Sequence, residues 1–93
     1  RVMNMEKPQS LIDLDVHNIP KSKFKILSND CNINSLIKKQ AKKLSISFDN
    51  IILWSSTSGI ETLWYDTYFE KGTGKLILTF RYGKKLRVLY HEN

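Results

Sequence analysis

The 93-residue chain is poor in the residues that disulfides, metal sites and membrane spans require: it has one cysteine and two histidines. A single cysteine, Cys31, allows no internal disulfide, so folding depends on packing, and we expect an intracellular (cytoplasmic or nuclear) location. The longest apolar runs, at 51–54 and 76–80, are far shorter than the about 20 residues of a spanning helix. No signal peptide is visible. These absences predict a chain without a membrane partner.

What is present is typical of a small globular domain. Apolar residues make up 41% of the chain, charged residues 26% and aromatic residues 11%. A chain of this size buries only roughly 60–65% of its unfolded surface, so we expect no deep, enclosed active site. The chain begins at Arg1 rather than Met, and we expect it to be part of a longer protein. Fifteen lysines and arginines against nine acidic residues give a net charge of +6, which attracts polyanions.

The first half of the sequence predicts two strands and a helix. Residues 11–16 and 23–27 alternate apolar and polar side chains, and the turn residues between them, Pro20 included, favour a hairpin. Asp30 or Asn32 can cap a helix that begins at Ile33. Its apolar side chains recur at helical spacing, and the opposite face carries lysines at 38, 39, 42 and 43.

The second half predicts mainly strands. Branched and aromatic residues favour a strand from Ile46 to Trp54, and residues 55–59 have the composition of a loop. The stretch 60–69 is compatible with a strand or a short helical turn. Residues 71–74 form a break, 75–82 alternate as a strand, and 85–90 are a further candidate strand.

This order of elements resembles the ubiquitin-like, or β-grasp, family over residues 11–83. The carrying segments are the entry into the hairpin turn (VHNI, 16–19), the helix (33–44), the third strand (46–54), a short turn (LWYDTYF, 63–69) and the last strand (LILTFR, 76–81). The resemblance implies an α+β fold, a ββαββ roll with one amphipathic helix packed on a small sheet. Residues 1–10 are then a flexible leader, and 84–93 a basic C-terminal tail or added strand.

Two departures from the family matter. The chain has no C-terminal Gly-Gly, since Gly83 is followed by Lys84 and Lys85, so we expect a built-in domain rather than a conjugated tag. If the tail pairs as an extra strand, the fold becomes a helix against a four-stranded antiparallel meander, outside the family.

No set of residues indicates an enzyme. His17 and His91 lie near opposite ends of the chain, without the spaced ligands that a metal needs. Gly72 and Gly74 are typical of a turn, not of a phosphate-binding loop. We expect no catalytic residue, no metal, no cofactor and no small-molecule substrate.

The resemblance implies a protein-binding surface on the exposed face of the sheet. By position it contains Ile19, Trp54 and Thr79, and the strand period of two adds Ile77. An exposed tryptophan would be a plausible centre for such an interface. The alternative is that Trp54 belongs to the core and faces the helix. The leading prediction is thus a non-catalytic interaction domain with a protein partner.

Two other functions stay open. The lysines favour a basic nucleic-acid (RNA)-binding module, whose cations would be Lys38, Lys39, Lys42, Lys43, Lys84, Lys85 and Arg87. Two tyrosines flanking the tail, Tyr82 and Tyr90, could stack on unpaired bases. The third possibility is a small inhibitor or immunity-type protein with the meander fold, which predicts a continuous hairpin from Leu76 to Tyr90.

Overall fold

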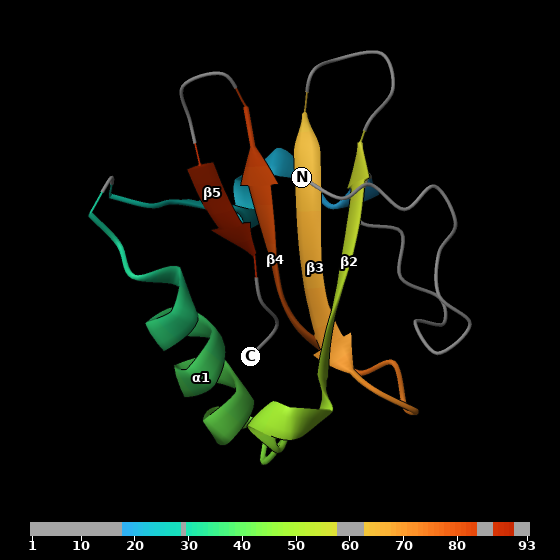
Figure 1. Ribbon diagram of the computed structural model, residues 1–93. Coiled ribbons are helices and arrows are strands. Elements are labelled where there is room, and N and C mark those ends of the chain that lie inside the picture. The colour runs from blue at the N-terminus through green and yellow to red at the C-terminus, as the bar shows by residue number, and fades with distance from the viewer. Residues whose placement is uncertain (1–17, 29, 58–62, 84–86, 91–93) are drawn as a thin grey trace.

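The described part of the chain folds into one α-helix and a five-stranded sheet (Figure 1). This computed structural model describes residues 18–28, 30–57, 63–83 and 87–90. In chain order the elements are η2 (Lys21–Lys23), β1 (Lys25–Ile26), α1 (Ile33–Lys43), η3 (Phe48–Asn50), β2 (Ile51–Thr57), β3 (Trp64–Glu70), β4 (Leu76–Tyr82) and β5 (Arg87–Tyr90). The predicted α+β class is confirmed. Among the described residues, no helix is both long enough and apolar enough to cross a bilayer.

The strands β2 to β5 form an antiparallel meander in which each strand pairs with the next along the chain. The sheet order is β1-β5-β4-β3-β2, and β1 pairs antiparallel with β5. The hairpin of β4 with β5 is the one that the meander alternative predicted. The segment 63–69, which resembled a short turn of the ubiquitin-like family, lies instead almost wholly in the seven-residue strand β3. The described strands therefore do not establish a β-grasp roll.

The expected N-terminal hairpin is only partly visible. Its first strand, 11–16, and the leader 1–10 lie outside the described residues. Its second strand is the short β1, whose described partner is β5. Ile26 is one of the apolar positions of the alternating segment 23–27, but its side chain is 73% exposed, because β1 lies at the edge of the sheet. Phe24, another apolar position of this segment, is half-buried.

The helix α1 forms where its capping and periodicity predict. The Asn32 side chain accepts a hydrogen bond from the Ser35 backbone N–H at 3.1 Å, which satisfies one of the free donors of the first turn. Ile37 and Ala41 are buried on the side that faces the sheet. The four lysines of the helix are exposed.

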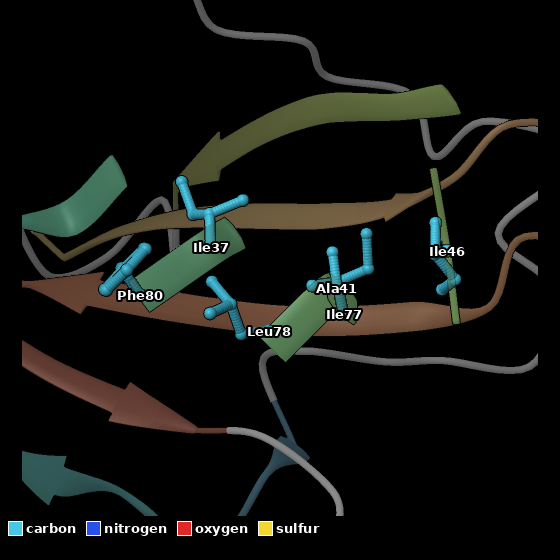
Figure 2. Packing of buried hydrophobic residues seen from close by; sticks show 6 residues of the cluster. All are labelled: Ile37, Ala41, Ile46, Ile77, Leu78 and Phe80. Atoms are coloured by element: carbon cyan, nitrogen blue, oxygen red, sulfur yellow. The ribbon is translucent and has the colours of Figure 1, made fainter. Parts of the chain in front are cut away.

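The core between α1 and the sheet is built mainly on β4. Figure 2 shows Ile37 and Ala41 of the helix over Ile77, Leu78 and Phe80 of β4. Ile46, just beyond the helix, completes this buried cluster. The Phe80 ring meets the Tyr68 ring edge-on, with 6.0 Å between centroids, a favoured aromatic geometry.

A β-bulge shifts the alternation of side chains along β4. Tyr68 of β3 is opposite Leu78, but the next residue, Phe69, is opposite Leu76. Ile77 is therefore the extra residue of the bulge, and both it and Leu78 join the core on the helix side. The period-two prediction that Ile77 shares a face with Thr79 is wrong for this reason.

The other face of the sheet is also covered. Trp54, Tyr65 and Phe69 form a second buried cluster there. Ile19 and Phe24, from the segment before and after η2, pack against it, and Figure 1 shows this blue segment behind the sheet. The sheet thus lies between the helix and the segment that precedes β1.

The helix ends in a Schellman motif. The Ile46 N–H donates to the Ala41 carbonyl at 2.9 Å, and the Ser45 N–H donates to the Lys42 carbonyl at 3.1 Å. These bonds require a left-handed residue after the last turn, and Ser45 takes that position with a φ of 60°. Ile46 is thereby turned into the core next to Ala41.

The strand predicted from residue 46 starts later, at Ile51. Residues 48–50 form the 3-10 turn η3 instead, because the Asn50 N–H donates to the Ser47 carbonyl at 3.0 Å. At the other end β2 continues through Ser55 and Ser56, which were predicted to be loop residues and are buried. The Ser55 hydroxyl donates to the Asp66 carboxylate at 2.8 Å, so a cross-strand hydrogen bond satisfies this polar pair.

Candidate nucleic-acid interface

The protein-binding surface predicted on the sheet is not an exposed surface. Trp54 is 5% exposed, and Ile77 and Thr79 are each 0% exposed. Ile19 packs against the buried cluster that contains Trp54, as part of the layer that covers it. Trp54 is a core residue, as the alternative held, although it faces the layer formed by residues 18–24 rather than the helix.

The helix lysines, in contrast, form a continuous exposed surface. Successive helical residues are about 100° apart, so these four side chains lie within an arc of about 140° on the side of α1 away from the sheet. We call this surface the lysine face: Lys38, Lys39, Lys42 and Lys43. Cations at the C-terminal end of a helix also interact favourably with its dipole, which helps the helix to carry four of them.

The rest of the predicted basic surface is elsewhere. Lys84 and Lys85 lie outside the described residues. Arg87 begins β5 opposite Tyr82, the last residue of β4. The C-terminal end of α1, which carries the lysine face, lies toward the other end of the sheet, where β4 begins, as Figure 1 shows. The structure therefore does not bring Arg87 together with the helix lysines.

An aromatic side chain borders the lysine face. Phe48 of η3 is 52% exposed, and the Lys38 ammonium lies 5.2 Å from the centroid of its ring. That distance is within the range of a cation–π interaction. The two residues are ten positions apart, and only the turn after α1 places them together.

Between these side chains the surface is hollowed. The hollow has a volume of about 380 Å³ and lies where α1 ends and η3 begins. Buried Ala41 and Ile46 form its apolar base, and Lys38, Lys42 and Phe48 border it. A volume of this size falls within the range of ligand sites, about 300–1,000 Å³. We call it the C-terminal hollow.

Two serines add hydroxyl groups to the C-terminal hollow. Ser45 and Ser47 both line it, and both are exposed. Ser45 has a left-handed backbone conformation, which glycine usually adopts at the end of a helix. This conformation is energetically unfavourable for serine, and its hydroxyl group is present there nonetheless. The hollow thus combines an apolar base, an aromatic ring, hydroxyl groups and cations.

The turn between β3 and β4 extends the basic surface. The Lys71 backbone N–H donates to the Asn50 carbonyl at 2.8 Å, which fixes this turn beside η3. Lys71 and Lys75 are exposed, and Figure 1 shows the turn at the same end of the molecule as the end of α1. Glycines at 72 and 74, with φ of 90° and 72°, provide the backbone conformations that the turn needs.

The acidic groups at this end are few among the described residues. Asp49 of η3 is exposed. The carboxylate of Glu70 accepts a hydrogen bond from the Thr73 hydroxyl at 2.6 Å. Against these, the lysine face and the turn supply six lysines. The balance of charge at this end is therefore positive.

The sequence predicted the lysine face but not the C-terminal hollow. No pattern in the sequence indicated a binding role for the other residues of this surface: Ser45, Ser47, Phe48, Lys71 and Lys75. The polar residues around Phe48, with Asp49 and Asn50 directly after it, are typical of a turn and could have separated it from the strand that follows. Its contact with Lys38 could not be read from spacing alone.

Other candidate chemistry finds no support within the described ranges. No group of three or more histidine, cysteine or acidic side chains there could hold a metal ion. His17 and His91 lie outside those ranges. Neither a scan of protein-family models nor searches of curated proteins and of solved structures found a match to this chain.

Proposed function

We propose that this chain is a non-catalytic module that binds nucleic acid through the lysine face. The observation that carries this proposal is the exposed arc of four lysines on α1, bordered by the half-exposed ring of Phe48. Lysine ammonium groups neutralise backbone phosphates and release counterions, which supplies most of the sequence-independent affinity of such proteins.

The protein-binding alternative has less support. Its predicted surface contained Trp54, Ile77 and Thr79, which are buried. Binding there would require the layer formed by residues 18–24 to move off Trp54, and the helix to move off Ile77. The ubiquitin-like resemblance implied that surface, and the present proposal does not depend on it. The observed meander is compatible with an inhibitor or immunity-type protein, but a fold of this kind does not indicate a function by itself.

The experiment is a titration of a fluorescently labelled single-stranded RNA of about 12 nucleotides, followed by anisotropy at two salt concentrations. For single strands, each neutralised phosphate contributes about 0.7 to the slope of log affinity against log salt. Four lysine–phosphate contacts therefore predict a roughly 50-fold loss of affinity between about 50 and 200 mM salt.

A charge-matched pair of variants localises the site. Lys38→Gln with Lys42→Gln removes two cations from the lysine face, and we expect the salt slope to fall by about 1.4. Lys23→Gln with Lys25→Gln removes the same charge from exposed positions near β1, and we expect a smaller change. Absence of binding at low salt would overturn the proposal. Equal competition by polyglutamate of the same charge would replace nucleic acid with an acidic protein as the partner.

A further inference from the structure

We infer that the C-terminal hollow is a site for one unpaired nucleotide, with the base against Phe48 and its phosphates on Lys38 and Lys42. This inference rests on the proposed function and names the form of nucleic acid that it binds. It assigns a role to Phe48, which the lysine face alone does not explain.

The apolar and aromatic parts of the hollow suit a base. Phe48 is 52% exposed, a large apolar surface for one side chain. Ala41 and Ile46 add buried apolar surface behind it. Every base has a flat π-face, so an exposed aromatic ring binds unpaired bases of any sequence.

The cations of the hollow suit the flanking phosphates. Lys38 and Lys42 are one helical turn apart on the border of the hollow, about 6 Å along the axis of α1. The ammonium of Lys38 lies over the Phe48 ring, 5.2 Å from its centroid, so a base that stacks on this face displaces the lysine side chain toward the adjoining phosphate. Ser45 and Ser47 provide hydroxyl groups that can donate to base or phosphate oxygens.

This arrangement distinguishes single strands from duplexes. Bases in a duplex are already stacked on one another, so Phe48 can contribute only where a base is free to leave its neighbours. The lysine face, in contrast, binds phosphates of either form. Preference for single strands should therefore depend on Phe48, and salt dependence on the lysines.

The test measures the affinity of wild type and Phe48→Ala for single-stranded RNA, single-stranded DNA and an RNA duplex of equal length. We expect Phe48→Ala to lose about 5- to 150-fold for both single strands and to keep its duplex affinity and its salt slope. Phe48→Tyr should keep the single-strand affinity. If Phe48→Ala lost affinity for single-stranded RNA but not for single-stranded DNA, the site would also contact the 2′-hydroxyl of the ribose.

A matched control uses another exposed apolar side chain. Leu53 on β2 is 45% exposed and lies outside the hollow, so Leu53→Ala should bind as wild type does. Thermal melting followed by circular dichroism shows that each variant is folded.

The outcomes separate the two proposals. Unchanged single-strand affinity in folded Phe48→Ala would overturn the nucleotide site and leave the lysine face as the binding surface. Equal loss for single strands and duplex would also overturn it. Absence of binding by the wild type would overturn the proposed function itself.

Discussion

The ammonium nitrogen of Lys38 lies 5.2 Å from the centroid of the Phe48 ring. This contact joins the helix to the turn that follows it and connects the two parts of the proposed interface. A cation–π pair at an exposed site contributes about 0.5–1 kcal/mol. The contact therefore gives a small stabilisation to the position of Phe48 beside the lysine face.

A double-mutant cycle measures this contact. We expect Lys38→Met, Phe48→Leu and the double variant to show a coupling of about 0.5–1 kcal/mol in chemical unfolding, since Met and Leu keep apolar contacts without charge or ring. The matched cycle of Lys39→Met with Phe48→Leu should show none, because no ring contact joins that pair. Equal coupling in the two cycles would contradict the account.

The helix end predicts a stabilising substitution. Ser45 has a φ of 60°, a conformation that costs about 1–2 kcal/mol for residues with a Cβ atom. Ser45→Gly removes this cost, but glycine also has more conformational freedom in the unfolded chain, which opposes folding. The net result should be a free energy of unfolding that is higher by about 0.5–1 kcal/mol. Urea unfolding checks the value, and Ser47→Gly, in extended backbone with a φ of -64°, is the control that should not stabilise. A fall in stability for Ser45→Gly would contradict the left-handed assignment.

A buried pair of hydroxyl groups predicts strong coupling between two strands. Thr67 and Thr79 face each other across β3 and β4, their hydroxyl oxygens are 3.2 Å apart, and both residues are 0% exposed. Replacing one by valine leaves the other hydroxyl without its partner, so each single variant should lose about 1–2 kcal/mol. The double valine variant should lose clearly less than the sum. Additive losses would show that the hydroxyl groups do not interact.

Because Trp54 is buried, we expect its substitution to lower the stability of the protein as substitutions in a core do. Trp54→Ala should cost about 3–5 kcal/mol of stability, whereas an exposed side chain would cost within about 0.5 kcal/mol. Its indole N–H is buried without a hydrogen-bond acceptor, so Trp54→Phe removes an unsatisfied donor. Removing that donor should contribute roughly 1–3 kcal/mol, which offsets part of the packing lost with the smaller ring. We therefore expect Trp54→Phe to lower the free energy of unfolding by less than about 1.5 kcal/mol. A small loss for Trp54→Ala would contradict the buried position.

Local signals in the sequence predicted the helix and most of the second half. The Asn32 cap and the spacing of Ile37 and Ala41 are confirmed because both depend on interactions within a few residues. The turn at 71–74 is confirmed for the same reason, since its glycines have positive φ. The meander was foreseen only as an alternative, because residues 60–69 have no clear period.

Features that depend on tertiary contacts escaped the sequence. The bulge at Ile77 reverses the face of one side chain, and its position depends on pairing with β3. The ubiquitin-like resemblance implied an exposed Trp54, and the alternative placed it against the helix. The layer from residues 18–24 that covers it could not be foreseen. Phe48 was placed on a strand because its aromatic ring favours one, whereas the Schellman motif and η3 turn the chain before β2.

The most direct test of the interface is a ¹⁵N–¹H correlation spectrum of the protein titrated with single-stranded RNA at low salt. The account predicts that amide shifts change most over the end of α1, the residues to Phe48 and the turn at Lys71 to Lys75. It predicts small changes for the buried amides of Trp54 and Thr67. Shifts centred on Trp54 and its neighbours, with the lysine face unaffected, would contradict it.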